Sequence, residues 1–170
     1  MLGDASITLA GGVEVMSNSA DFIQGFRWGT RMGDGNVHDM MLGALHVPFG
    51  HGHMGITAEN ISDRYGISRD SQDEFALTSQ KRASKAINDG LFKEQILPIE
   101  IKTRKGVNIF EIDEHPKPET TIETLSNLRT AFKKEGVVTA GNASGINDGA
   151  AALILANEEK AKKGMPLARI

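Results

Sequence analysis

The sequence contains no cysteine, so the chain forms no disulfide and supplies no cysteine nucleophile of its own. It also has no run of about 18 or more apolar residues, the length that a bilayer-spanning helix needs. Its 19 basic and 22 acidic residues give a formal charge of -3, so there is no basic field to attract nucleic acid. We therefore expect neither a membrane nor a nucleic acid among its partners.

A secretory signal is also missing at the start, because residues 1–4 (MLGD) have neither a basic segment nor an apolar core. A cytoplasmic location is the resulting expectation. With 170 residues, of which 39% are hydrophobic, the chain is long enough to bury one good core. A strand pattern at residues 5–10 stands close to the start, and residues 167–170 resemble the entry to another strand. We therefore expect this chain to be the middle of a larger fold.

The stretch that is richest in functional side chains runs from residue 136 to residue 156. Val137 and Val138 predict a strand, residues 141–149 a glycine-rich and asparagine-rich loop, and the apolar residues 150–156 a buried strand. Polar side chains in this loop, Ser144 among them, can bond to the loop itself or to a ligand. An elaborate turn and a ligand-binding loop both fit the pattern.

Residues 17–53 show no periodic pattern, and glycines interrupt short groups of large apolar residues. The apolar side chains between Phe22 and Leu45 are expected to pack either into an internal core or onto another subunit. Three histidines follow at 46, 51 and 53. They fit a metal site poorly, because zinc sites favour four ligands at familiar spacings. A loop that positions substrate and plain surface histidines remain as alternatives, and we expect no metal and no cofactor.

The middle of the chain has clear helix signals. Thr57 is the expected cap of a helix over 58–65, which ends at Gly66 and carries an apolar stripe that includes Ile61. A longer helix begins after Ser68 or Ser71, ends at Gly90, and has its apolar stripe over residues 75–87. Its basic face at 80–85 fits a solvated surface, or else a phosphate-bearing ligand.

Weaker signals complete the pattern. Residues 96–101 and 108–112 predict a hairpin around Lys105-Gly106, with Pro98 favouring an edge position. Short helices are expected over 122–128 and after Asn157, the second of them ending near Gly164 and Pro166. Together these elements predict an α/β core, present as 5–12 and 150–170, with an α+β excursion between its two parts.

Five stretches carry a resemblance to a known family: residues 11–17 (GGVEVMS), 53–60 (HMGITAEN), 68–73 (SRDSQD), 128–132 (LRTAF) and 139–149 (TAGNASGINDG). In this order they resemble the thiolases, and most of all the biosynthetic acetyl-CoA acetyltransferases and the bacterial β-ketothiolases. The resemblance covers essentially the whole chain but under half of a thiolase subunit. It implies part of the thiolase fold, with residues 1–15 and 147–170 from the N-terminal α/β core. Residues 16–146 would then form the inserted loop domain that covers coenzyme A.

The resemblance also implies an activity that this chain cannot perform alone. Thiolases transfer acyl groups between coenzyme A thioesters through an acylated cysteine. The nucleophilic cysteine of the family would lie before Met1, and the activating histidine and the acid/base cysteine after Ile170. The implied partners are an acyl-CoA substrate and, in the complete protein, three further copies in a homotetramer.

What this part would supply is substrate binding, in a mostly apolar pocket with a few fixed polar groups. His53 and Met54 would line the acyl and pantetheine region, and Ser144 would hydrogen-bond pantetheine. Lys117 and Thr124 would lie near the nucleotide. The implied apolar walls are Leu45, Ala131, Phe132 and Ala140. A non-catalytic acyl-CoA-binding or assembly module derived from thiolase is the alternative. A phosphate-cradling enzyme is disfavoured, because residues 141–145 lack the lysine that ends a P-loop.

Overall fold

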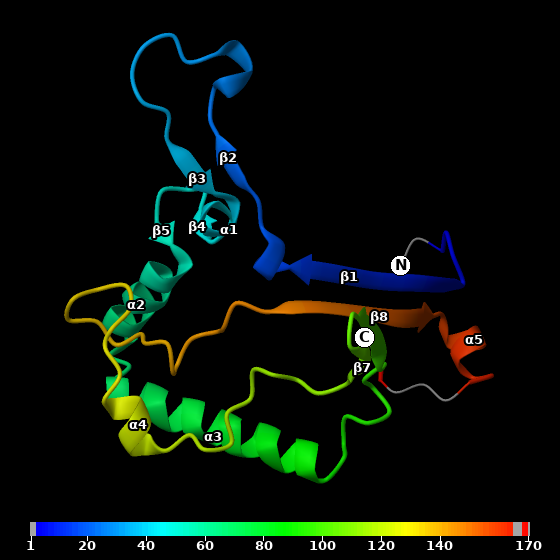
Figure 1. Cartoon of the computed structure of the whole chain (residues 1–170). Coiled ribbons are helices and arrows are strands. Elements are labelled where there is room, and N and C mark those ends of the chain that lie inside the picture. Colours follow the sequence, from blue (N-terminus) through cyan, green and yellow to red (C-terminus); the bar gives the residue numbers. More distant parts are fainter. Residues whose placement is uncertain (1–2, 165–167, 170) are drawn as a thin grey trace. The chain divides into compact units, whose positions relative to one another are not determined.

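The computed structural model describes residues 3–164 and 168–169, and the chain divides into two compact units (Figure 1). One unit is formed by Met1–Asp39 together with Ile146–Ile170, and the other by Met40–Gly145. Residues 16–39 thus group with the two ends of the chain by contact. No helix in the described residues is long and apolar enough to cross a membrane.

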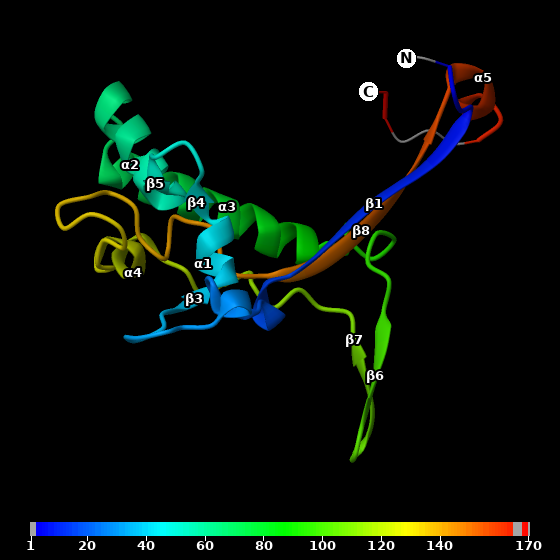
Figure 2. The same cartoon turned by 90° about the horizontal axis from the view of Figure 1, so that it is seen from above.

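The first unit is built on a long antiparallel ribbon of β1 (Ile7–Val15) and β8 (Asp148–Ala156), which run side by side in both views (Figure 1, Figure 2). The strand expected at residues 5–10 does not end in a tight turn at Gly11-Gly12, because both glycines lie inside the ladder opposite Ala152 and Ala151. A Cβ on Gly11 would lie 2.9 Å from the Ala151 carbonyl oxygen. Glycine here allows two strands to approach closely, and it does not make a turn.

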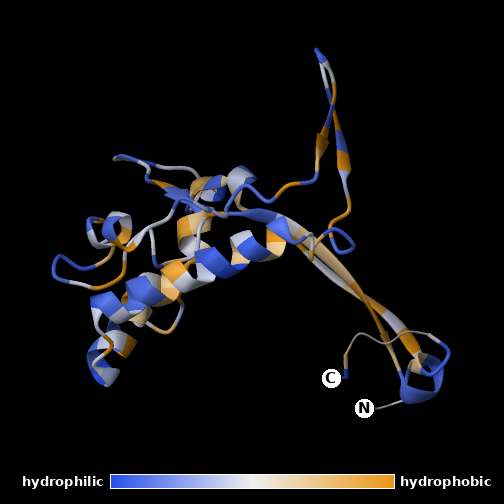
Figure 3. Ribbon diagram, turned by 90° about the horizontal axis from the view of Figure 1, so that it is seen from below, coloured by the Kyte–Doolittle hydropathy of each residue, from blue (hydrophilic) through white to orange (hydrophobic). Residues whose placement is uncertain are grey.

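The prediction that residues 150–156 form a strand is confirmed, but the expected burial of that strand is not seen. All nine residues of β8 are exposed, and Figure 3 shows hydrophobic residues along the ribbon. In the described residues this sheet has only two strands, and nearly all residues of β1 are exposed as well. Its apolar composition therefore contributes to exposed surface.

At the end of the ribbon, Asp148 pairs with Val15 in the last position of the ladder. The Asp148 carboxylate accepts hydrogen bonds from the Ser17 amide at 2.9 Å and from the Ser17 hydroxyl. These hydrogen bonds, the one from the hydroxyl first, lower the pKa of Asp148 below its ordinary value. The carboxylate thus ties the beginning of η1 (Met16–Asn18) to the start of β8.

Short elements complete this unit. The strands β2 (Asp21–Ile23) and β3 (Val37–Asp39) pair as a hairpin, and η2 (Phe26–Trp28) lies in the loop between them. Trp28 is 85% exposed and Met32 97% exposed in that loop. The predicted helix after Asn157 is confirmed as α5 (Glu158–Ala161), capped by the Asn157 side chain. The predicted signals at Pro166 and over 167–170 lie wholly or partly outside the described residues.

The second unit begins with α1 (Met40–Ala44) and a two-residue ladder of β4 (His46–Val47) and β5 (Gly52–His53). Helices α2 (Met54–Tyr65) and α3 (Arg69–Asn88) follow. The α3 helix is capped by Ser68, one of the two predicted residues, and Gly66 ends α2 in the left-handed conformation, as predicted. Next come β6 (Ile99–Thr103), β7 (Gly106–Phe110) and α4 (Ile122–Ser126).

The hairpin of β6 and β7 confirms the predicted turn at Lys105-Gly106, although both strands are shifted from the expected bounds and Pro98 precedes the ladder. The predicted cap of α2 is wrong. This helix begins at Met54, and the His53 ring nitrogen Nδ1 accepts the Gly55 amide at 3.0 Å, so Thr57 lies inside the helix. The helix is longer because an imidazole nitrogen can cap it as an oxygen would.

The expected apolar faces of the two long helices are largely exposed. Ile61 is 48% exposed on α2, and Phe75 is 78% exposed on α3. The fully buried residues on these helices are instead polar: Glu59 and Ser62 on α2, and Asp73 on α3. Of these, Glu59 and Asp73 hydrogen-bond to groups within residues 125–142. Buried backbone and side-chain groups need such hydrogen-bond partners, because water does not reach them.

The expected strand at Val137-Val138 is also wrong. Residues 129–142 form an irregular segment with one antiparallel bridge, between Thr130 and Thr139. Val138 and Thr139 are buried, and so is Leu125 of α4. Residues 130–142 are called the return segment below.

Candidate functional site

The predicted acyl-binding residues cluster at the N-terminus of α2. The ring of His53 stacks on the ring of Phe132, with centroids 4.7 Å apart and an interplanar angle of 25°. His46 meets the same imidazole edge-on at 5.4 Å. Because Nδ1 of His53 accepts the Gly55 amide, the proton of the neutral ring is on Nε2, which is a donor.

Leu45 and Met54 are joined through their backbones, since the Met54 amide donates to the Leu45 carbonyl at 2.9 Å. Phe132 approaches the helix so closely that a Cβ on Gly55 would lie 2.3 Å from its ring. The structure therefore brings together four of the predicted residues, Leu45, His53, Met54 and Phe132. Spacing alone does not predict this cluster, because Phe132 comes from a distant part of the sequence.

Three further predicted residues lie along the return segment or just after it. Ala131 donates its amide to the Val138 carbonyl at 2.9 Å, which folds the segment back on itself. Ala140 is exposed in the tight turn where the Asn142 amide donates to the Thr139 carbonyl at 3.3 Å. Ser144 is exposed two residues beyond Asn142. Ala131 and Ala140 therefore belong to the return segment, and Ser144 follows shortly after it.

Lys117 and Thr124 lie outside this cluster, Lys117 in the segment before α4 and Thr124 in the first turn of that helix. The backbone amide of Lys117 donates to the Gln80 side chain of α3 at 2.9 Å, and the Lys117 residue is exposed. The Thr124 hydroxyl accepts the Thr121 amide at 3.0 Å and donates to the Thr121 carbonyl at 2.8 Å. Its hydroxyl proton is therefore already used in capping the helix, while Lys117 keeps a free side chain at the surface.

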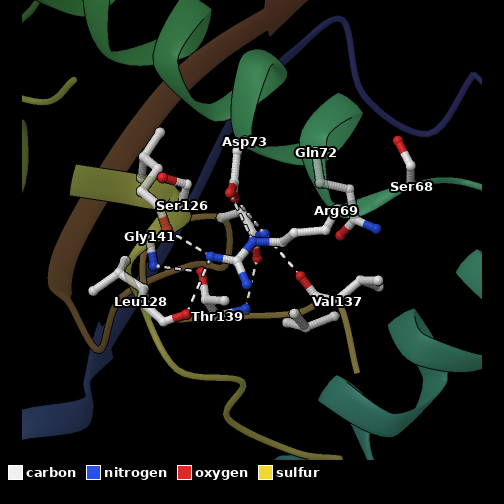
Figure 4. A network of polar contacts seen from close by, with 12 residues as sticks. Ser68, Arg69, Gln72, Asp73, Ser126, Leu128, Val137, Thr139 and Gly141 are labelled. Carbon is white, nitrogen blue, oxygen red and sulfur yellow. Dashed lines mark hydrogen bonds and ion pairs between the residues drawn. The ribbon is translucent and has the colours of Figure 1, made fainter. Parts of the chain in front are cut away.

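A buried ionic network lies between α3, α4 and the return segment (Figure 4). The Arg69 guanidinium donates to Asp73 at 2.7 Å and to the carbonyls of Leu125 at 2.5 Å and Leu128 at 3.2 Å. The other oxygen of Asp73 accepts the Asn142 side-chain amide at 3.0 Å. The charge of Asp73, 1% exposed, is thus both paired and hydrogen-bonded, as a buried charge requires.

A second buried carboxylate comes from α2. Glu59 is 1% exposed and accepts the backbone amides of Val137 at 2.9 Å and Val138 at 3.0 Å. Nearby, Lys133 and Asp63 form an ion pair at 2.7 Å in which both side chains are about half exposed. The hydrogen bond and charge of Asp63 raise the pKa of Lys133 above its ordinary value.

The burial of these groups is not apparent from the sequence. Glu59 and Asp73 look like ordinary helix carboxylates, and a purely hydrophobic periodicity assigns such charged positions to solvent. Their partners are backbone groups far along the chain, which no periodic pattern reveals.

The site has the chemistry of a binding surface without a nucleophile. The chain has no cysteine, and the described residues contain no group of three or more His, Asp or Glu placed to hold a metal ion. A cleft of about 530 Å³ lies elsewhere, beside the β6–β7 hairpin, and none of the predicted binding residues lines it. What remains is an aromatic and aliphatic cluster in which Nε2 of His53 is a donor.

The chain matches the family model described as "Thiolase, N-terminal domain" over residues 1–159. It therefore belongs to the thiolase family, and the predicted membership and fold are confirmed. Among curated relatives, it is 51% identical to the beta-ketothiolase BktB of Cupriavidus necator over 100% of this chain and 44% of that protein. It is 50% identical to the acetyl-CoA acetyltransferase of Thiocystis violacea over 99% of this chain and 44% of that protein.

Solved structures give the same assignment. The acetyl-CoA acetyltransferase from Syntrophomonas wolfei has a TM-score of 0.89 at 48% identity, covering 96% of this chain and 41% of that one. Human mitochondrial 3-ketoacyl-CoA thiolase in complex with CoA has a TM-score of 0.86 at 40% identity, covering 95% of this chain and 40% of that one. The chain thus spans less than half the length of the relatives that it matches.

Proposed function

We propose that the intact protein carrying this chain is an acyltransferase of the thiolase type, an acetyl-CoA C-acetyltransferase. It condenses two acyl-CoA molecules, or cleaves a 3-ketoacyl-CoA, through an acylated cysteine outside these residues. The chain's own part is to hold the coenzyme A thioester. A cytoplasmic location, a homotetrameric assembly and the lack of a further cofactor belong to the same proposal.

The observation that carries this proposal is the cluster of His53, Phe132, Leu45 and Met54 in a family whose relatives are named for acetyl-CoA chemistry. Pantetheine is a flexible chain of amides, which favours an apolar wall with a few fixed hydrogen bonds. The Nε2 proton of His53 and the exposed Ser144 hydroxyl supply donors, and Phe132 supplies the wall. The exposed Lys117 ammonium suits the phosphates at the nucleotide end.

The test is steady-state thiolysis of acetoacetyl-CoA by the intact protein with His53→Ala or Ser144→Ala. Loss of one hydrogen bond to the ligand raises KM by about 3- to 10-fold. The matched controls are His51→Ala and Ser79→Ala, which remove an exposed imidazole and an exposed hydroxyl that are not among the proposed binding residues. If both test variants keep the parent KM and kcat, the assignment of this site to coenzyme A is wrong.

The alternative is a non-catalytic acyl-CoA-binding or assembly module, and the specific observation in its favour is the absence of cysteine from the chain. The two functions separate in one measurement on the intact protein. Saturable binding of coenzyme A by calorimetry, without any thiolysis of acetoacetyl-CoA, would establish the module and exclude the enzyme.

A further inference from the structure

The return segment is held in place by side chains that the proposed binding set does not include. Two of its successive amides, those of Val137 and Val138, point at the buried carboxylate of Glu59. A buried carboxylate without partners is strongly unfavourable, and so is a buried amide without an acceptor. Each group therefore satisfies the other, and displacing the segment from α2 would leave both unpaired.

The contact between Glu59 and the return segment leaves no space for a side chain at Gly136. A Cβ added to Gly136 would lie 2.2 Å from the Glu59 carboxylate, far inside van der Waals contact. The carboxylate thus lies directly against the backbone of residues 136–138. Such charge-assisted hydrogen bonds are shorter and stronger than those between neutral groups.

A second attachment fixes the other end of the segment. Asn142 accepts the Thr139 amide at 2.8 Å and donates to the Val137 carbonyl at 3.0 Å and to Asp73 at 3.0 Å. A Cβ on Gly141 would lie 2.5 Å from Leu125 and from Leu128 of the α4 region, so the turn is packed against that side too. Both attachments are internal to the unit formed by Met40–Gly145.

Before these attachments in the sequence, the segment carries Phe132, the ring that stacks on His53. The amide of Ala131 is bonded to the carbonyl of Val138, whose own amide is held by Glu59. A displacement at Val138 is therefore passed to Ala131 and on to Phe132 through one hydrogen bond and one peptide unit. The position of the Phe132 ring therefore depends on the Glu59 carboxylate, which is not itself part of the proposed binding site.

We infer that Glu59 is a positioning residue that fixes Phe132 against His53 before any ligand arrives, so that the acyl-CoA wall is preformed and does not close on binding. This inference rests on the proposed function. Pre-organisation removes the cost of ordering the segment from the binding step, and its loss appears as weaker binding. The chemical step, which uses residues outside this chain, is left unchanged.

The first test is hydrogen exchange of the intact wild-type protein, followed in peptides that cover the return segment. A preformed wall keeps the amides of Ala131, Val137 and Val138 protected without ligand, and added coenzyme A changes their exchange by less than about twofold. Exchange that is fast without coenzyme A and slow with it would overturn the inference. This measurement needs no variant, so it holds even if the substitutions below prevent folding.

The second test is Glu59→Gln in the intact protein, because a side-chain amide offers only one acceptor oxygen and places an NH2 group near the backbone donors. We expect exchange of the return segment to rise at least about tenfold without ligand, and KM for acetoacetyl-CoA to rise about tenfold with kcat within about twofold. Saturating coenzyme A restores the protection.

The matched control is Asp63→Asn, one turn further along α2. It breaks the exposed ion pair with Lys133 on the same segment, and exposed pairs contribute little. Exchange and KM should both stay at the parent values. If Glu59→Gln speeds exchange but leaves KM unchanged, the positioning role is refuted. The proposed function still stands in that case, provided that Ser144→Ala and His53→Ala raise KM.

Discussion

Two buried carboxylates on the helices of this chain, Glu59 and Asp73, bind groups of the return segment that lie far along the sequence. Glu59 accepts two amides of the return segment, and Asp73 links Arg69 to Asn142. The glycines opposite them are equally constrained, since a Cβ at Gly136 or Gly141 would overlap its neighbours. At the scale of single residues, the fold is therefore held by polar groups and close backbone approach more than by large apolar side chains.

Asp148 gives a prediction about pH at the same scale. Its hydrogen bonds from Ser17 lower its folded pKa, so the folded state binds fewer protons than the unfolded state in the acid range. The stabilisation is present above the ordinary aspartate pKa, about 4, and is lost as the pH falls through the lower folded value. Asp148→Asn should therefore be less stable than the parent at neutral pH, and the difference should shrink in acid.

The measurement is urea denaturation of both proteins at a series of pH values between neutral and strongly acid. Asp4→Asn is the control, because Asp4 is exposed and its substitution should leave the stability curve unchanged. If the free energy of unfolding of Asp148→Asn differs from that of the parent by the same amount at every pH, the charge of Asp148 does not have this role.

At the scale of elements, local capping decides where the helices begin. The sequence leaves Ser68 and Ser71 as equal candidates for the cap of α3, and the structure selects Ser68, whose hydroxyl accepts the Ser71 amide at 3.2 Å. We predict that Ser68→Ala lowers the free energy of unfolding by about 1 kcal/mol, the usual value of a helix cap. Thermal and urea denaturation of Ser68→Ala and of the parent measure this difference.

Ser71→Ala is the matched variant, since Ser71 is exposed inside the first turn and alanine is the better helix former. It should leave stability unchanged or raise it slightly. Equal losses for both variants would show that α3 does not depend on a single cap.

Elements whose signals are local could be predicted from the sequence, and those that depend on distant partners could not. Caps correctly indicate the starts of α3 and α5, and Gly66 correctly marks the end of α2, because those signals act within one turn of helix. The short helix expected over 122–128 is found as α4, which ends at Ser126. The start of α2 was missed because histidine is not among the preferred capping residues. The buried faces were missed because burial here follows hydrogen bonds to residues 125–142, and a periodic pattern records only apolarity.

The candidate site shows the same division. Its residues were named through the family resemblance, and the structure places Leu45, His53, Met54 and Phe132 together. Ala140 lies in the return segment and Ser144 two residues after it, whereas Lys117 lies before α4 and Thr124 within it. The positions of Glu59 and Asn142 could not be predicted from the sequence, since neither residue type indicates burial.

At the scale of the whole molecule, large apolar side chains are exposed over much of the described chain. The β1–β8 ribbon, the β2–β3 loop and the stripes of α2 and α3 all present them (Figure 3). Monomeric soluble proteins seldom expose large contiguous apolar patches, and scattered single apolar residues need no explanation. The relatives that the chain matches are more than twice as long, so in those proteins further residues can cover part of the equivalent surface.

The β2–β3 loop is the part of this surface where we predict contacts between subunits. Trp28 and Met32 are 85% and 97% exposed there, and large apolar residues on a projecting loop are typical anchors of an interface. If the intact protein forms the proposed tetramer, the double variant Trp28→Ser with Met32→Ser should give species of smaller mass than the parent, as measured by sedimentation equilibrium. Phe75→Ser on α3, which removes a side chain that is 78% exposed, is the matched control and should keep the parent mass. An unchanged mass for the double variant would place the subunit contacts elsewhere, whereas a smaller mass for Phe75→Ser would move them to the face of α3 that carries Phe75.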